Sequence, residues 1–149
     1  MNAEAGETAT ARTGTDGLRT DIRVGSHRLI ADEPLSAGGT DLGPSPYGLL
    51  SSALASCTAM TLQMYAEFKK LDLESVTVSV THNRIHARDC EDCETTSGRI
   101  DEFHRVISLA GELTEAQRQR MLEIADKCPV HRTLTGETRI RTERGDLAA

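Results

Sequence analysis

The pattern of hydrophobic and polar positions is dominated by one long uncharged stretch. No charged side chain occurs between Asp41 and Glu67, although 27% of the residues in the chain are charged. Ser45 is a favourable helix N-cap, and Pro46 suits the first helical position because its missing N–H is not needed there. The pattern therefore predicts a long helix that begins near Ser45 and lies where water is scarce.

The two sides of this predicted helix differ in composition. Apolar and small side chains recur at steps of three and four residues, which predicts one inward face. This face consists of Leu50, Ala53, Leu54, Cys57, Met60, Thr61, Met64 and Phe68. The opposite side is small and uncharged, so another helix or a sheet can approach it closely. We expect a central helix that is covered on both sides.

A membrane span is the alternative interpretation of the same stretch, because residues 49–66 approach the length that a span requires. Six Ser, Thr and Gln side chains within it argue against this alternative. Neither flank carries residues typical of an interfacial anchor. We therefore expect no association with a membrane.

Shorter alternating segments flank the helix. Residues 18–24 and 27–31 predict two strands that are joined by Gly25-Ser26, a two-residue hairpin turn. Residues 76–81 alternate valine with Ser or Thr and predict a half-buried strand, whose parity continues through His82 and His86. Another strand is expected over about residues 100–109.

The C-terminal third predicts two helices and a strand. Thr114 and Gln117 have the spacing of a capping box, for a helix that runs to about Lys127. Pro129 predicts the start of a short second helix, and a final strand is expected near residues 138–142. This order of strands and helices describes an α+β fold.

The expected domain organisation is simple. Residues 1–16 are rich in Ala, Thr, Gly and Glu and have little to bury, so we expect a disordered or loosely attached N-terminal arm. Residues 17–149 contain no internal repeat and no linker. We therefore expect them to form a single domain.

Composition narrows the range of functions. A formal net charge of −6 offers no general attraction to nucleic acid. With two Phe, two Tyr and no Trp, the core must consist of smaller side chains, and a homodimer would help to bury them. The N-terminal residues lack the features of a secretory signal. We expect a cytoplasmic protein whose four cysteines are reduced at rest.

Two cysteines have contrasting local environments. Cys128 is expected at a helix N-cap, where backbone N–H groups and the helix dipole favour the thiolate. The positive potential there is increased by Lys127, His131 and Arg132. Cys57 is expected in the middle of the long helix, where an isolated cysteine is usually a small hydrophobic residue. It would be a nucleophile only if its thiolate were stabilised and a second thiol lay within reach.

Two separated motifs surround these cysteines. The first is Gly38-Gly39-x-Asp41-x-Gly43-Pro44-x-Pro46, followed by Leu49-Leu50 and Ala55-Ser56-Cys57-Thr58; the second is Ala125-Asp126-Lys127-Cys128-Pro129-Val130-His131-Arg132. Together they resemble the OsmC/Ohr family of thiol peroxidases. The resemblance covers about residues 25–143. It implies an OsmC-like α+β fold with antiparallel sheets and a long central helix, in an intertwined homodimer with its active site at the interface.

The resemblance also implies roles for the two cysteines. Cys57 would be the peroxidatic residue, whose thiolate attacks an organic hydroperoxide and becomes a sulfenic acid. Cys128 would resolve this sulfenic acid as an intramolecular disulfide. An external thiol, lipoyl-type in some relatives, would then reduce the disulfide. Such an oxidoreductase serves as an antioxidant in oxidative stress and needs no cofactor.

One feature of the sequence departs from the family. There, an arginine from the N-terminal strands activates the thiolate and is held by a glutamate just after the proline that opens the central helix. Here, Tyr47 and Gly48 follow that proline. Candidates for the arginine and for another holding group are Arg23, Arg28, Glu33 and Asp41. The alternative function is an OsmC-like small-ligand, metal-binding or redox-sensing protein without efficient peroxidase turnover.

A second group of potential ligands lies further along the chain. His82, His86, Cys90 and Cys93 could form a tetrahedral zinc site, because thiolate and imidazole suit that ion. Acidic residues beside the two cysteines would disfavour thiolates in the absence of metal, which argues against a redox Cys-x-x-Cys pair. The alternative interpretation is a polar, exposed strand end and loop.

Overall fold

The computed structural model describes residues 6–146, which contain three α-helices and five β-strands. This composition confirms the predicted α+β class. The chain divides into two compact units, each assembled from two stretches of sequence. Unit 1 comprises the chain up to Ser52 together with Thr81–His104, and unit 2 comprises Ala53–Val80 together with the chain from Arg105. The single domain over residues 17–149 stays a prediction.

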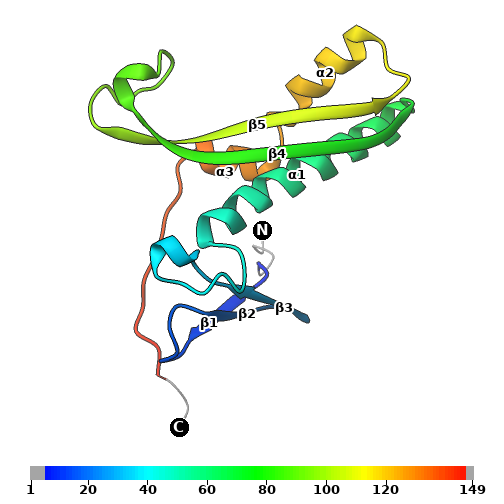
Figure 1. Ribbon diagram of the computed structural model, residues 1–149. Coiled ribbons are helices and arrows are strands. Elements are labelled where there is room, and N and C mark those ends of the chain that lie inside the picture. The colour runs from blue at the N-terminus through cyan, green and yellow to red at the C-terminus, as the bar shows by residue number, and fades with distance from the viewer. Residues whose placement is uncertain (1–5, 147–149) are drawn as a thin grey trace. The chain divides into compact units, whose positions relative to one another are not determined.

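Unit 1 contains a three-stranded antiparallel sheet of β1 (Ala9–Thr13), β2 (Thr20–Val24) and β3 (His27–Ala31), in that order (Figure 1). β2 and β3 form the predicted hairpin across Gly25-Ser26. Gly25 has a φ of 58°, a left-handed conformation that glycine adopts without steric cost. The turn prediction is therefore confirmed together with its physical reason.

β1 corrects the expectation of a disordered arm over residues 1–16. Ala9 pairs with Val24 and Thr13 pairs with Thr20, so this segment extends the hairpin by one strand. All five residues of β1 are exposed. Backbone pairing rather than burial holds the strand, which is why its composition did not predict it. Residues 1–5 of the expected arm lie outside the described part of the chain.

Asp32 organises the loop between β3 and the long helix, which includes a short 3-10 helix, η1 (Leu35–Ala37). Its carboxylate accepts hydrogen bonds from the backbone N–H groups of Glu33, Thr40 and Leu42, at 2.8, 3.2 and 3.2 Å, and from the Thr40 hydroxyl at 2.7 Å. The Thr40 hydroxyl lowers the pKa of Asp32, and the backbone donors reinforce it against the effect of burial. The loop therefore depends on one buried carboxylate.

The long helix, α1 (Pro46–Lys69), begins where the sequence predicts, and the hydroxyl of Ser45 accepts a hydrogen bond from the Gly48 N–H at 3.1 Å. None of the helices in the described residues is long and apolar enough to cross a membrane. The residues of α1 that are fully buried recur at four-residue steps: Leu54, Thr58, Leu62 and Ala66.

The predicted inward face of α1 is wrong in part. Met60, Met64 and Phe68 are 65%, 70% and 79% exposed. Because successive residues are 100° apart around a helix, the buried stripe is centred away from these three side chains, and Cys57 lies at its edge. In a helix segment without charges, hydrophobic spacing did not distinguish the buried side from the exposed one.

β4 (Leu73–His86) and β5 (Arg99–Gly111) form a two-stranded sheet and run side by side in Figure 1. Both strands were predicted. Along β4 the alternation of burial changes phase after His82, so that Ile85 is half-buried and His86 is exposed. The expectation that His82 and His86 share one face of the strand is therefore wrong. The loop between the strands opens with a 3-10 helix, η2 (Ala87–Asp89).

The C-terminal helices are α2 (Glu115–Ala125) and α3 (Pro129–Thr135). The Thr114–Gln117 capping box and the N-cap position of Cys128 are both confirmed. The strand expected near residues 138–142 is absent, because residues 137–146 form neither helix nor strand. The core of unit 2 joins α1 to α2 through the buried residues Leu62, Ala66, Met121, Ile124 and Ala125.

Candidate active site

Two cysteines from distant parts of the sequence meet within unit 2. Cys57 of α1 and Cys128 at the N-cap of α3 lie close enough for each thiol to shift the pKa of the other. Both are free thiols. Cys128 is completely buried, whereas Cys57 is partly exposed. The structure thus brings together the two residues that the sequence singled out, and of the two only Cys57 is open to a solute.

Cys128 has the environment that its N-cap position predicts. Its sulfur accepts a hydrogen bond of 3.3 Å from the backbone N–H of His131. Burial by itself would raise the pKa of this thiol, but hydrogen bonds from the His131 N–H, Cys57 and Thr58 outweigh burial and lower the pKa. The prediction that Cys128 has the lower pKa of the two cysteines is therefore confirmed.

The pKa of Cys57 is shifted in the opposite direction to that of Cys128. Burial raises the pKa of Cys57, and the neighbouring Cys128 raises it further, while the Val130 backbone and the Thr61 side chain act in the other direction. When the pair loses one proton, the negative charge therefore lies on Cys128 in preference to Cys57. Neither property follows from one residue alone, since each sulfur sets the charge of the other.

Arg105 of β5 supplies a positive charge that the sequence analysis missed. Its guanidinium donates hydrogen bonds to the Thr58 hydroxyl at 3.0 Å, the Ala125 carbonyl at 3.3 Å and the Asp126 carboxylate at 2.7 Å. The Arg105 side chain is only 12% exposed. Asp126 also lies 3.7 Å from Nδ1 of His131. A fixed charge is thus held beside the residue that follows Cys57.

A sequence signal for Arg105 existed. Along this part of β5, half-buried and exposed residues alternate, and Arg105 is one of the half-buried ones, together with Phe103, Ile107 and Leu109. A charged residue in an apolar alternation needs a partner inside the protein. The sequence could have identified Arg105 as buried, but it could not show that Thr58 and Asp126 are the partners.

The arginines that were candidates for activating Cys57 lie in unit 1. Arg23 of β2 and Arg28 of β3 are directly opposite each other in the sheet. Together with Arg12 they line a hollow of about 910 Å³, whose apolar wall includes Leu29 and Leu49. The activating role of Arg23 or Arg28 stays a prediction.

His82 belongs to an aromatic cluster in unit 1. Its ring stacks on Tyr47 with 4.2 Å between the ring centroids, and the Phe103 ring lies 5.0 Å away. Nε2 of His82 is 2.8 Å from the carboxylate of Asp101. Tyr47 therefore packs against a histidine at the position where the family resemblance calls for an acid.

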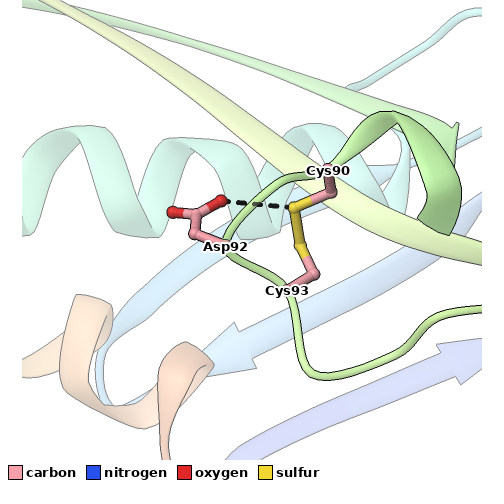
Figure 2. The surroundings of a disulfide bond; sticks show 3 residues. All are labelled: Cys90, Asp92 and Cys93. Carbon is pink, nitrogen blue, oxygen red and sulfur yellow. Dashed lines mark hydrogen bonds between the residues drawn. A yellow bond between two sulfur atoms is a disulfide. The ribbon is translucent and has the colours of Figure 1, made fainter.

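The remaining cysteines form a disulfide, Cys90–Cys93, with 5.6 Å between their Cα atoms (Figure 2). This corrects the expectation that all four cysteines are reduced. Within the part of the chain that the structure describes, the potential metal ligands that cluster within 4.8 Å are Cys90, Asp92 and Cys93. The predicted site of His82, His86, Cys90 and Cys93 is therefore not assembled, because His82 is engaged elsewhere and β4 changes phase before His86.

A family model described as OsmC-like protein matches residues 38–143. No match was found among curated proteins. An organic hydroperoxide resistance protein from Elizabethkingia anophelis superposes with a TM-score of 0.68 at 19% identity, over 91% of this chain and 92% of that chain. An organic hydroperoxide resistance protein, OsmC, from Legionella pneumophila gives 0.67 at 19% identity, over 91% and 93%. An OsmC-like protein from Mycoplasma pneumoniae gives 0.70 at 20% identity, over 90% of each chain. At these identities the similarity establishes the fold.

Proposed function

The chain belongs to the OsmC-like protein family, and on this basis we propose that it is a cysteine-based peroxidase that reduces organic hydroperoxides. The observation that carries the proposal is the pairing of a partly exposed thiol, Cys57, with a buried thiol of lower pKa, Cys128, each of which shifts the pKa of the other. A peroxidase of this type needs one sulfur that the peroxide can reach and a second that can close a disulfide. The pair meets both requirements.

In the first step, the proton of Cys57 passes to the thiolate of Cys128. The new Cys57 thiolate is stabilised by the Val130 backbone and the Thr61 side chain. It attacks the terminal oxygen of the hydroperoxide, and the O–O bond breaks. The alkoxide takes from Cys128 the proton that Cys57 had given up, and it leaves as an alcohol. Cys57 is then a sulfenic acid, and Cys128 is again a thiolate.

In the second step, the Cys128 thiolate attacks the sulfur of the Cys57 sulfenic acid. The S–S bond forms, and the hydroxyl group leaves as water with a proton from solvent. An external thiol, of the lipoyl type by resemblance to the family, reduces the disulfide and is itself oxidised. Each turnover oxidises external thiols, and the cytoplasm is the compartment that keeps thiols reduced. The proposal therefore includes a cytoplasmic location.

Exposed apolar side chains on α1 support both an apolar substrate and a homodimer. Met60, Met64 and Phe68 recur at four-residue steps and leave a contiguous apolar stripe in contact with water. Surfaces of this kind often mark interfaces or ligand sites. The proposal therefore includes a second copy of the chain that covers part of the stripe, and a substrate without a strongly charged body.

The test is stoichiometric oxidation of the reduced protein by cumene hydroperoxide, with disulfides mapped by mass spectrometry. We expect a Cys57–Cys128 disulfide in the wild-type protein, none in Cys57→Ser, and a sulfenic acid on Cys57 in Cys128→Ser. The matched control is the Cys90→Ser/Cys93→Ser variant, which should oxidise as fast as the wild type. Persistence of both thiols for as long as free cysteine under the same conditions would refute the proposal.

A redox-sensing protein without efficient turnover is the second candidate. The observation that favours it is the stacking of Tyr47 on His82, at the position where the family resemblance calls for a glutamate. A sensor would form the Cys57–Cys128 disulfide once but would not consume further peroxide when a dithiol is added. Sustained alcohol production with excess dihydrolipoamide would therefore favour the peroxidase.

A further inference from the structure

We propose that the loop between β4 and β5 is a redox-controlled zinc site. Reduced Cys90 and Cys93 bind the ion together with the carboxylate of Asp92, and the Cys90–Cys93 disulfide is the metal-free state. The site lies in unit 1 and uses neither Cys57 nor Cys128. It therefore does not rest on the proposed peroxidase function.

The backbone already holds the two cysteines at a separation that suits a shared ion. Their Cα atoms are 5.6 Å apart, and the N–H of Cys90 donates to the carbonyl of Ala87 at 3.1 Å, which anchors the start of the turn. In a tetrahedral site with Zn–S bonds of about 2.3 Å, two sulfurs lie roughly 3.8 Å apart. Rotation of the two side chains is sufficient to reach that separation after reduction.

The position of the Asp92 carboxylate also supports a metal site, in addition to the spacing of the two cysteines. Its Oδ1 lies 3.3 Å from Sγ of Cys90 (Figure 2). The sulfur of a disulfide carries no hydrogen, so this acceptor receives no hydrogen bond from it. In a tetrahedral zinc site, a sulfur and a carboxylate oxygen lie about 3.6 Å apart. Asp92 is therefore close to the position of a third ligand, and a cation beside both atoms would stabilise it.

The negative charge of the loop favours binding of a cation, and its sulfur ligands favour zinc among the common metal ions. Around the two cysteines the chain carries Asp89, Glu91, Asp92 and Glu94 against a single nearby cation, Arg88. Two thiolates in this negative environment need a positive ion to stabilise them. Thiolate ligands favour zinc over calcium and magnesium, which prefer sites made of oxygen. A water molecule or an external thiol would complete the tetrahedron.

Oxidation of the two thiolates to the disulfide releases the zinc ion. The zinc dithiolate, one organic hydroperoxide and two protons give the Cys90–Cys93 disulfide, free Zn²⁺, one alcohol and one water. The two thiolates lose two electrons, and the O–O bond of the hydroperoxide takes them as it breaks. Reduction by a dithiol restores both thiolates and the metal site. Any two-electron oxidant of thiols, such as a small-molecule disulfide, has the same effect on the loop.

The test is a titration of the full-length protein with zinc chloride, in competition with a chromophoric zinc chelator and without peroxide. We expect the reduced wild type to bind one zinc per chain. Affinity should fall at least tenfold in Cys90→Ser, and also after oxidation by a small-molecule disulfide, with recovery on reduction. Cys57→Ser should bind zinc like the wild type. Equal affinity of the wild type and Cys90→Ser, or of the reduced and oxidised forms, would overturn the proposal.

The role of Asp92 needs its own matched control, because any lost acid weakens the attraction for a cation. We expect Asp92→Asn to lower zinc affinity at least tenfold, and Glu91→Gln less than threefold. Cobalt substitution gives a second readout: sulfur-to-metal charge-transfer absorption should appear in the reduced wild type and fall by about half in Cys93→Ser. Equal losses in Asp92→Asn and Glu91→Gln would show that Asp92 is not a ligand.

Discussion

The guanidinium of Arg105 donates a hydrogen bond of 3.0 Å to the hydroxyl of Thr58, the residue that follows Cys57 in α1. The same hydroxyl donates a hydrogen bond of 2.7 Å to the carbonyl of Leu54, and Thr58 also lowers the pKa of Cys128. A hydroxyl has one hydrogen, so Leu54 and the Cys128 thiolate compete for it. Because Arg105 occupies the acceptor side of Thr58, that hydrogen remains available to those two partners.

Replacing Arg105 should therefore change the chemistry of the thiol pair. In Arg105→Met we expect the pH profile of alkylation of the thiol pair to shift to higher pH, because the Thr58 side chain, which lowers the pKa of Cys128, loses the guanidinium that holds it. Arg105→Lys should restore part of the shift. The measurement is the alkylation rate against pH with a fluorogenic thiol reagent, in a Cys90→Ser/Cys93→Ser background.

Arg118 provides the matched control for Arg105. Its guanidinium donates to the carbonyls of Leu109 and Gly111 at 2.8 and 3.0 Å. Losing a hydrogen bond from a charged group costs about 1.5–3 kcal/mol, so Arg105→Met and Arg118→Met should both lower stability. An equal shift of the pH profile in both variants would contradict the role of Arg105.

The opposite pKa shifts of Cys57 and Cys128 predict which of the two forms the thiolate first. The pKa of Cys128 is lowered, mainly by the His131 N–H and Cys57 acting against burial, so the folded protein holds this thiolate at a pH where an unfolded chain holds a thiol. Ultraviolet thiolate absorbance should appear below the usual range for cysteine and vanish in Cys128→Ser. In Cys57→Ala it should move to higher pH, because Cys57 no longer donates a hydrogen bond. Persistence of the early absorbance in Cys128→Ser would assign the thiolate to Cys57 instead.

Asp32 predicts a stability change in acid. Its pKa is lowered by the Thr40 hydroxyl together with backbone donors, so its contribution to stability is fully present above the unfolded pKa of about 3.9 and is lost as pH falls through the folded value. Asp32→Asn should lower the melting temperature at pH 7. In acid, the melting temperature of this variant should depend less on pH than that of the wild type. The exposed Asp21→Asn is the control for thermal unfolding at both pH values. A melting temperature at pH 7 that Asp32→Asn leaves unchanged would show that the carboxylate does not hold the loop.

Two glycines of the first motif predict a steric effect. A Cβ at Gly39 would meet the carbonyl of Glu33, and one at Gly43 would meet the carbonyl of Ile30. Since backbone cannot yield as a flexible side chain does, Gly39→Ala and Gly43→Ala should each lose about 1–3 kcal/mol in chemical denaturation. Gly14→Ala, where a Cβ would meet nothing within 4 Å, should be nearly neutral. Similar losses in all three would point to a general effect of glycine replacement.

Local chemistry explains what could be predicted. The Gly25-Ser26 turn, the start of α1 after Ser45 and the Thr114–Gln117 capping box each depend on residues a few positions apart. The N-cap environment of Cys128 is local in the same way, and its lowered pKa followed from it. The α+β class followed from the order of these elements, and the two cysteine motifs indicated the family.

Only the tertiary structure decided the rest, because each remaining feature depends on a partner far along the chain. β1 exists through pairing with β2, although its composition resembles that of a disordered arm. The uncharged α1 offers two possible inward faces, and packing against α2 buries Leu62 and Ala66 rather than Met64 and Phe68. The chain by itself named Cys57 and Cys128. Folding brought them close enough to shift each other's pKa values and brought Arg105 to Thr58. These interactions join residues that are far apart along the chain, so no local pattern in the sequence encodes them.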